Sequence, residues 1–457
     1  MSFHFSHCIR ARVRSAFRSV GPGCVILLLA APLCVAASAR STAGTQPRPS
    51  HTAWVASWGS AMLATDRGEA PDFSNETLRE IVHTSVGGPR VRVWFSNRFG
   101  SEPLRIGAAH VALTAAGTPS GSDSPRADDE GPGGPSAYSA VDESAIQPGS
   151  DRTLTFHHQG SVVIPPGSTI VSDPVSLDVP ALANLSISVY FPGHTMGTTE
   201  HELALQTSYA SNGDTVDAAK LDAKAWREHS WYFLSGVDVA APHDSAVIAF
   251  GDSITDGWQS TPNKNDRWPD FLAKRLAANS GTREAGVLGV VNVGISGNRV
   301  LLDGAGPNAV SRIDRDIVAR SGARFMIVLE SINDIGRFAS DHQPYGNLTE
   351  RLEAGLAQMA TQAHQHGMRV FGATLTPYQG CGYYSAAGDQ VRQGVNQWIR
   401  ASHTFDGVVD FDKAVRDPQN PLRFAPQYDS GDHLHPSNAG YKAMANAIDL
   451  SLFTRGR

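Results

Sequence analysis

The sequence has few charged residues and no basic run beyond its first residues. Thirty-eight Lys and Arg stand against 44 Asp and Glu in 457 residues, which leaves a formal charge of −6. Proteins that bind nucleic acid usually carry a basic stripe or patch, so we expect no nucleic-acid partner. Glycine and proline, at 44 and 27 residues, are close to average usage and follow no period, which excludes collagen-like and repeat architectures.

Long apolar runs are scarce as well. After the N-terminal stretch Val25 to Ala31, no segment approaches the ~18 to 20 apolar residues of a membrane span, so we expect no stable membrane insertion. Four arginines precede that stretch, and the triplet Ala37-Ser38-Ala39 follows it with small residues. This order is typical of a secretory leader, with an N-terminal anchor as the alternative. We predict a signal peptide at 1–39, a linker at 40–52, and export to the periplasm or outside the cell.

Cysteine is nearly absent from the predicted mature chain. Three of the four cysteines, Cys8, Cys24 and Cys34, lie in the predicted leader, which leaves Cys381 alone. A single thiol excludes an internal disulfide, so the exported protein must be stabilised by its core. Cys381 stands between two glycines without a recognisable His and acidic partner, and we interpret it as a bystander.

Residues 53–240 alternate between apolar and polar side chains over short runs. Arg90-Val91-Arg92-Val93 and Leu185-Ser186-Ile187-Ser188 are examples. A period of two at close spacing indicates antiparallel strands, and many such runs indicate an all-β sandwich or jelly-roll-like domain. Residues 115–140, rich in Gly, Pro, Ser and Asp, are expected to form a solvated loop.

The pattern of apolar residues changes over residues 241–457, where strand-like apolar runs alternate with segments of helical periodicity. The expected strands are Ala246 to Phe250, Val287 to Val293, Phe325 to Leu329, Val370 to Thr374 and Val408 to Phe411. The expected helices are Trp268 to Ala278, Ala309 to Ala319, Leu348 to His366, Asp389 to Ser402 and Asn438 to Leu450. This alternation predicts an α/β fold, a doubly wound parallel sheet of about five strands whose ligand site lies at the carboxyl ends of the strands.

Candidate catalytic residues stand at one such strand end and near the C-terminus. Ser253 follows the first apolar run, and a serine oxygen needs a base to take its proton before it becomes a good nucleophile. His435 offers an imidazole for that task, and Asp432, three residues earlier, offers a carboxylate to orient it. Two alternatives remain open here: Ser253 as a turn residue, and a zinc pair formed by His433 and His435 with Asp432.

Two further strand ends could supply donors for an oxyanion. Gly297 follows the second predicted strand, where a backbone N–H can be exposed, and Asn333 follows the third with a side-chain amide. Taken singly, Gly297 is also compatible with a turn glycine and Asn333 with a helix cap. Because all these residues occur at strand ends in the expected order, we interpret them as one site.

The set Gly251-Asp252-Ser253, Gly297, Asn333 and Asp432-x-x-His435 resembles the four blocks of the SGNH, or GDSL-type, hydrolases. The resemblance covers about 245–452 and implies a flavodoxin-like fold that hydrolyses carboxylic esters without metal or organic cofactor. It also implies Ser253 as nucleophile, His435 as base, Asp432 as the orienting residue, and an oxyanion hole formed by the N–H groups of Ser253 and Gly297 with the Asn333 amide. One position departs from the family pattern, because Ser331 stands where a glycine is usual.

We therefore expect a secreted serine ester hydrolase that works through an acyl-enzyme. Flanking stretches are similar to a bacterial branch of arylesterases and acylhydrolases from xylanase gene clusters, which favours a short acyl group, such as acetyl, on a small molecule or polysaccharide. A lipase or arylesterase acting on lipid or aryl esters is one alternative. A non-catalytic carbohydrate-binding protein is another, motivated by aromatic residues of the β-rich half that include Trp54, Trp58, Trp94, Trp226 and Trp231.

Overall fold

The computed structural model describes residues 53–65, 70–116, 118–119, 141–222, 226–241, 244–279, 287–340 and 345–454. The predicted signal peptide and linker, and most of the predicted loop at 115–140, lie outside these residues. Residues 51–457 form one compact unit. The predicted division at 240/241 into two domains therefore stays a prediction, although the architecture changes there.

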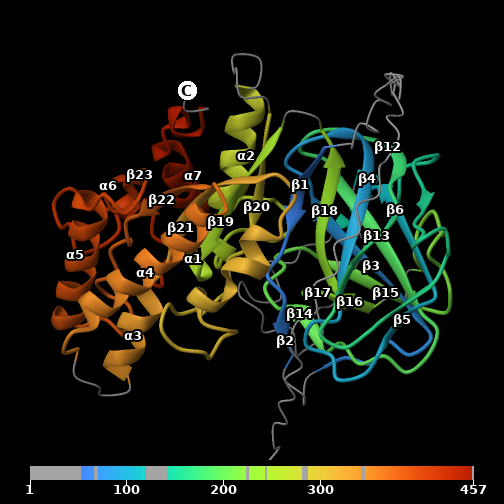
Figure 1. Cartoon of the computed structure of the whole chain (residues 1–457), viewed down its shortest axis with the longest axis horizontal. Coiled ribbons are helices and arrows are strands. Elements are labelled where there is room, and N and C mark those ends of the chain that lie inside the picture. Colours follow the sequence, from blue (N-terminus) through green and yellow to red (C-terminus); the bar gives the residue numbers. More distant parts are fainter. Residues whose placement is uncertain are drawn as a thin grey trace, which may run out of the picture. The chain divides into compact units, whose positions relative to one another are not determined.

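The N-terminal half contains antiparallel strands (Figure 1). They are β1 (Trp54–Gly59), β2 (Leu63–Ala64), β3 (Glu76–His83), β4 (Gly88–Ser96), β5 (Leu104–Ile106), β6 (Ala108–Leu113), β7 (Thr118–Pro119), β8 (Val141–Asp142), β9 (Arg152–Thr153), β10 (Val162–Ile164), β11 (Thr169–Val171), β12 (Val175–Val179), β13 (Asn184–Phe191), β14 (Thr199–His201), β15 (Ser208–Asn212), β16 (Trp226–Glu228), β17 (Trp231–Tyr232) and β18 (Leu234–Ala240). One sheet has the order β1-β18-β4-β11, with β12 beside β4, and a six-stranded sheet has the order β16-β15-β3-β13-β6-β9.

The C-terminal half contains a five-stranded parallel sheet with the order β20-β19-β21-β22-β23. Its strands are β19 (Ser245–Gly251), β20 (Leu288–Asn292), β21 (Ala323–Leu329), β22 (Arg369–Ala373) and β23 (Gly407–Val409). The first strand of the half lies between the second and the third, which is the flavodoxin-like order. This confirms the predicted parallel sheet, and its carboxyl edge is where β19, β20 and β21 end beside one another.

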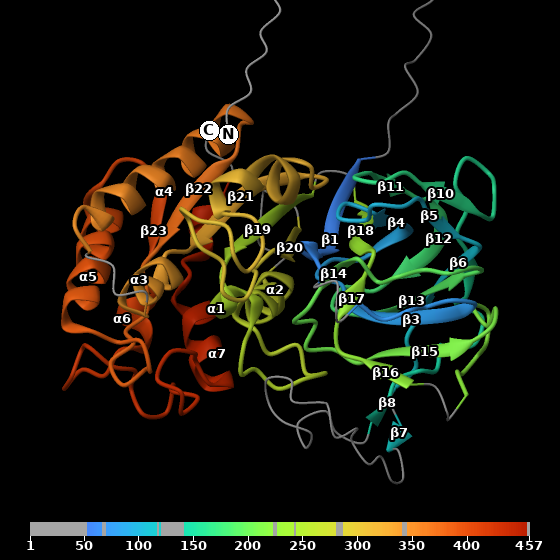
Figure 2. The same ribbon diagram turned by 90° about the horizontal axis from the view of Figure 1, so that it is seen from below.

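Helices cover both faces of this sheet (Figure 2). They are α1 (Ser253–Asp256), α2 (Trp268–Ala278), α3 (Ile332–Ser340), α4 (Leu348–Gln365), α5 (Ala386–Ala401), α6 (Phe411–Val415) and α7 (Asn438–Ala447), with short 3₁₀ segments at Ala309–Arg312 and Leu450–Phe453. Helices α2 and α7 pack against each other on one face, and α4 packs beside residues 309–318 on the other. The sheet is therefore doubly wound, as the alternating pattern predicts.

The segment Ala309 to Ala319 is helical, as predicted, but its winding is not that of a regular α-helix. The chain forms a 3₁₀ turn over Ala309–Arg312 and then a π-helical turn over Ile313–Val318. This winding turns the Arg312 guanidinium into the core, where it lies 4.4 Å from the Phe250 ring centroid and 2.8 Å from Asp316. The buried guanidinium is thus paired with a carboxylate, as a buried charge requires.

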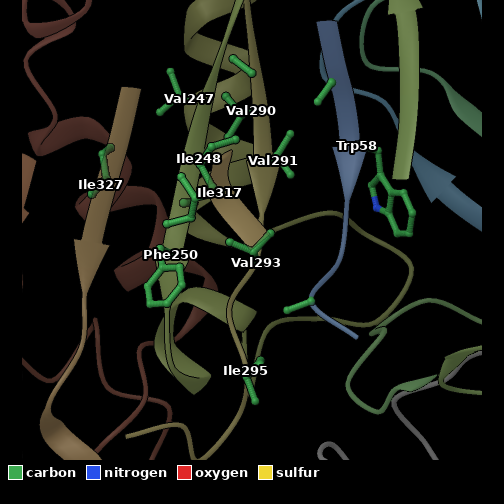
Figure 3. Packing of buried hydrophobic residues seen from close by; sticks show 14 of the residues in the cluster. Trp58, Val247, Ile248, Phe250, Val290, Val291, Val293, Ile295, Ile317 and Ile327 are labelled. Atoms are coloured by element: carbon green, nitrogen blue, oxygen red, sulfur yellow. The ribbon is translucent and has the colours of Figure 1, made fainter. Parts of the chain in front are cut away.

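The hydrophobic core runs from the parallel sheet into the β-rich half. All seven residues of β19 are buried. In Figure 3, Ile327 of β21 and Trp58 of β1 lie on opposite sides of the apolar side chains that project from β19 and β20. Strand β1 comes so close to β20 that a Cβ on Gly289 would lie 2.4 Å from the Ala56 carbonyl oxygen. The β-rich half thereby covers the outer edge of the parallel sheet.

Candidate active site

Ser253 is the first residue of the one-turn helix α1, directly after β19. A Cβ on Gly251 would lie 2.4 Å from the Leu329 carbonyl oxygen, so only glycine fits where β19 meets β21. The Asp252 side chain caps the turn by accepting a hydrogen bond from the Ile254 N–H at 2.9 Å. The N–H of Ser253 belongs to the first turn, which has no intrahelical acceptor. Its hydroxyl and its N–H are both available to a substrate.

His435 and Asp432 reach Ser253 from a loop that ends at α7. The His435 Nε2 lies 2.8 Å from the Ser253 Oγ, although 182 residues separate them along the chain. The His435 Nδ1 lies 2.7 Å from the Asp432 Oδ2. Because a carboxylate only accepts, Nδ1 carries the proton and Nε2 is left to accept one from Ser253. The structure thus brings the three candidate residues into one hydrogen-bonded row.

Helix α7 and the loop after α1 hold this row together. The Tyr441 hydroxyl donates a hydrogen bond of 2.6 Å to the Trp258 carbonyl oxygen. The Trp258 ring lies 5.9 Å from the His435 ring, centroid to centroid. These contacts join the segment that carries His435 to the segment that follows Ser253.

The Asp432 carboxylate is held in its charged form. Burial opposes this, but the hydrogen bonds from the His435 ring and from the N–H groups of Leu434 and His435 outweigh it and keep the pKa of Asp432 well below its ordinary value. A carboxylate that stays ionised can orient the imidazole and stabilise the imidazolium that forms when the imidazole takes a proton.

Gly297 lies in a turn after β20 that is tied to α1. Its φ of 75° is in the region that favours glycine. The preceding residue, Ser296, donates from its N–H and its hydroxyl to the Asp256 Oδ2 at 3.0 and 2.9 Å. Among the described residues, no hydrogen bond is made by the Gly297 N–H. The Gly297 N–H is therefore available as a donor, and its turn is held by hydrogen bonds to Asp256, three residues after Ser253.

Asn333 lies in the first turn of α3, on the other side of the Gly297 turn. Its Nδ2 donates to the Asn298 carbonyl oxygen at 3.0 Å, and its Oδ1 lies 3.4 Å from the Tyr383 hydroxyl, which can donate to it. The next residue, Asp334, accepts hydrogen bonds from the N–H groups of Val300 and Leu301. The amide orientation is thereby set, and one Nδ2 proton remains for a substrate oxygen.

Ser331, the departure from the family pattern, adopts a backbone conformation that favours glycine. Its φ is 114°, which side chains rarely adopt. The residue is fully buried, its N–H donates to the Glu330 carboxylate at 3.1 Å, and its hydroxyl has no partner among the described residues. The loop therefore follows the glycine-like course despite the serine.

We predict that replacing Asn333 with alanine lowers kcat by about 10²- to 10³-fold, the usual cost of removing one oxyanion donor. KM should change little, because the amide acts on charge that develops in the transition state. Steady-state kinetics with p-nitrophenyl acetate would measure both constants. Asn279→Ala, at the exposed end of α2, is the matched control and should leave both unchanged. An Asn333→Ala enzyme with wild-type kcat would contradict this assignment.

Behind Ser253 lies a group of buried carboxyl groups. Burial, with the nearby charges of Asp334 and Asp256, raises the pKa of Asp252 to about 7. Burial also raises the pKa of Asp334 to about 6 and that of Glu330 well above its ordinary value. The second oxygens of Asp252 and Glu330 have no hydrogen-bond partner among the described residues. The folded protein therefore favours protonated carboxyls here.

We predict that Asp252→Asn is more stable than the wild type at pH 8, by at least about 1 kcal/mol, since one pKa unit corresponds to about 1.4 kcal/mol. The raised pKa means that Asp252 stabilises the fold below the unfolded-state pKa of 3.8, and that this contribution is lost as the pH rises through about 7. Asparagine keeps the oxygen that caps α1 and does not titrate. Urea unfolding at pH 5 and 8 would measure the difference, and a gain that does not grow with pH would contradict the prediction.

The zinc alternative requires His433 and His435 to converge, and they do not. The His433 Nδ1 lies 2.6 Å from the Asp429 Oδ2, while the His435 ring lies between Asp432 and Ser253. Within the described ranges, no group of three or more His, Cys, Asp or Glu side chains could hold a metal ion. The two histidines thus have separate partners.

Sequence reasoning missed several residues that shape the site. Asp256 and Tyr383 lie within stretches that drew attention for other reasons, but nothing in the sequence indicated their contacts with Ser296 and Asn333. His201, from the β-rich half, lies 3.0 Å from Asp256, and no motif or spacing pointed to it.

One family of known proteins is similar to part of this chain. Residues 249–443 match the model of the GDSL-like lipase/acylhydrolase family. A search of curated proteins found no significant match. None of the described helices is long and apolar enough to cross a membrane.

Several solved structures are similar to the C-terminal half. The acetylxylan esterase Axe2 from Geobacillus stearothermophilus is 22% identical, with 47% of this chain and 97% of that chain covered and a TM-score of 0.34. The aryl esterase of M. smegmatis is 16% identical, with 44% and 95% covered and a TM-score of 0.35. Est24, a carbohydrate acetylesterase from Sinorhizobium meliloti, is 15% identical, with 44% and 95% covered and a TM-score of 0.34.

Proposed function

Because residues 249–443 match the model of the GDSL-like lipase/acylhydrolase family, we propose that the chain is a carboxylic ester hydrolase, that Ser253 is its nucleophile and that it works through an acyl-enzyme. The observation that carries this proposal is the 2.8 Å contact between the Ser253 Oγ and the His435 Nε2. An imidazole oriented by a carboxylate at that distance can take the hydroxyl proton as the oxygen attacks.

The proposed cycle has two halves. His435 takes the proton of Ser253 as its oxygen bonds to the ester carbonyl carbon, and the carbonyl oxygen becomes an oxyanion held by the N–H groups of Ser253 and Gly297 and the Asn333 amide. The oxyanion collapses, the C–O bond to the alcohol breaks, and His435 returns the proton to the leaving alcohol. Water then repeats the sequence on the acyl-enzyme and releases the acid. No cofactor is required for these steps.

We propose that the substrate is a hydrated ester with a short acyl group, such as acetyl on a saccharide. Among the described residues, the exposed large apolar side chains are Val163 and Leu302, and only Leu302 belongs to the catalytic half. A lipase that works at a lipid surface needs a larger exposed apolar patch. This scarcity favours small polar esters over lipids.

A panel of p-nitrophenyl esters from two to twelve acyl carbons, with acetate release from acetylated xylan measured beside it, tests the substrate class. We expect kcat/KM to be highest at two to four carbons and to fall by about tenfold or more at eight. Ser253→Ala serves as the blank for background hydrolysis. A kcat/KM that rises through eight to twelve carbons would favour the lipase alternative.

The aromatic side chains that motivated a carbohydrate-binding role are largely engaged within the protein. Trp58 and Trp231 are buried, with ring centroids 4.9 Å apart. The Trp94 Nε1 donates to Asp238 at 2.7 Å, and the Arg92 guanidinium lies 4.6 Å from the Trp54 ring. The Trp226 side chain lies outside the described residues. We therefore give the β-rich half no binding role of this kind.

Two organisational features belong to the proposal. We propose that residues 53–240 form a sandwich-like domain, supported by the antiparallel sheets of five and six strands. We also propose export through the leader at 1–39. N-terminal sequencing of the protein recovered from the growth medium or periplasm would test this, since it should begin near residue 40.

A further inference from the structure

His201 is a buried histidine that joins the β-rich half to α1. It ends β14, is 3% exposed, and stacks on the Trp231 ring at 5.6 Å between centroids. Its Nδ1 lies 2.9 Å from the Ala61 carbonyl oxygen and its Nε2 lies 3.0 Å from the Asp256 Oδ1. Both ring nitrogens thus face oxygen atoms, one in each half of the protein.

The pair formed by His201 and Asp256 holds a proton. A carbonyl oxygen only accepts, so Nδ1 donates to Ala61, and the contact of Nε2 with a carboxylate oxygen requires a second proton. Burial opposes a charged imidazole, but the Asp256 carboxylate and the hydrogen bonds to Asp256 and Ala61 outweigh it and raise the pKa of His201. Two other charges face the ring: Arg267, which lowers the pKa, and the neighbouring Glu200.

Asp256 connects His201 to the turn that contains Ser296 and Gly297. Its other oxygen, Oδ2, accepts both hydrogen bonds from Ser296, the residue before Gly297. The turn also packs directly on α1, because a Cβ on Gly294 would lie 2.3 Å from the Asp256 N. The carboxylate of Asp256 is therefore the bridge between His201 and the backbone that presents the Gly297 N–H.

We propose that His201 is a positioning residue for ester hydrolysis: through Asp256 and Ser296 it sets the place of the Gly297 N–H, so that the β-rich half completes the active site. This inference rests on the proposed function, in which Gly297 stabilises the oxyanion. If the Asp256 carboxylate lost the hydrogen bond from His201, it could rotate and release Ser296, and a displacement of about 1 Å at an oxyanion donor can cost on the order of 10²-fold in rate.

Two amide substitutions test the two hydrogen bonds of the His201 ring one at a time. In His201→Gln the side-chain NH₂ can reach the place of Nε2 and donate to Asp256. In His201→Asn the shorter amide reaches only the place of Nδ1 and donates to Ala61. We expect His201→Asn to lose about 10- to 100-fold in kcat with KM within about threefold, and His201→Gln to stay within about fivefold of the wild type. Kinetics with p-nitrophenyl acetate and thermal unfolding would be recorded for each protein.

The pH profile provides a second readout. As the pH rises through the raised pKa of His201, the pair loses its proton and the stabilising contact with it. We expect the kcat of the wild type to fall on this alkaline side. The fall should be absent in His201→Gln, whose amide does not titrate. This comparison remains available if His201→Asn does not fold.

The outcomes distinguish this inference from the proposed function. If the wild type hydrolyses the ester and Ser253→Ala does not, the proposed function stands, and a wild-type kcat in a folded His201→Asn protein would overturn the role of His201 alone. A loss in His201→Gln equal to that in His201→Asn, or an alkaline fall that persists in His201→Gln, would also overturn it. If every variant, including Ser253→Ala, still hydrolysed the ester at the wild-type rate, the proposed function itself would be overturned.

Discussion

Replacing Ser253 with alanine should lower kcat by on the order of 10⁶-fold, to a small residue of activity above the uncatalysed rate. Without the hydroxyl, the His435 Nε2, now 2.8 Å from the nucleophile, has no proton to take and no acyl-enzyme can form. The remaining activity would come from the oxyanion donors, which can still polarise the carbonyl for attack by water. KM should change much less than kcat, since the hydroxyl makes its bond only during the reaction.

Steady-state and burst kinetics with p-nitrophenyl acetate would test this result, because the burst reports the acyl-enzyme directly. Ser311→Ala is the matched control: this exposed serine lies in the same half, and its N–H and its hydroxyl donate to nearby Asn308. It should retain wild-type kcat. A Ser253→Ala protein that keeps a burst and a wild-type rate would show that another residue is the nucleophile.

Replacing His435 with alanine should cost kcat about as much as losing Ser253. In the proposed mechanism the two residues act as one unit, so removal of the base leaves the serine without a group that takes its proton. The double variant should therefore be no slower than either single variant, because the second change removes a residue that has already lost its role. In the wild type, activity should fall on acidification, since an imidazole that already carries two protons cannot accept another.

His433 offers a close control for this prediction. It lies two residues away, carries the same ring, and bonds to Asp429 instead of Asp432. His433→Ala should retain kcat within about threefold. A large loss in His433→Ala together with a small loss in His435→Ala would mean that the wrong histidine has been assigned. Loss in both that is restored by added zinc would favour the metal alternative.

Much of the C-terminal fold could be predicted from local pattern. Short continuous apolar runs such as Ala246 to Phe250 are typical of strands covered on both faces, and β19 is buried along its whole length. Prediction failed where short elements or buried polar groups decide the conformation. Strand β23 ends at Val409, before the predicted end at Phe411, because the Asp410 side chain accepts from the Lys413 N–H and caps α6.

The candidate residues of the active site could also be found in the sequence, because Ser253, Gly297 and Asn333 stand in short motifs after strands, and Asp432 and His435 stand in a motif just before α7. Strands β20, β19 and β21 are neighbours in the parallel sheet, so the first three of these motifs meet at one edge. Ser331 shows the limit of such motifs: it stands where the family pattern has glycine, and its backbone nevertheless has a φ of 114°. Surrounding structure, which a motif does not contain, determines that conformation.

The sequence by itself determined the parallel sheet and the strand ends and made Ser253, Asp432 and His435 the candidate catalytic residues, since these depend on local periodicity and on residue chemistry. Only the tertiary structure decided that the hydroxyl and the imidazole of two of them lie within a hydrogen bond, and that His201 reaches Asp256 from the β-rich half. Such contacts join residues tens to hundreds of positions apart, and their formation depends on how complete elements pack, which no local pattern encodes.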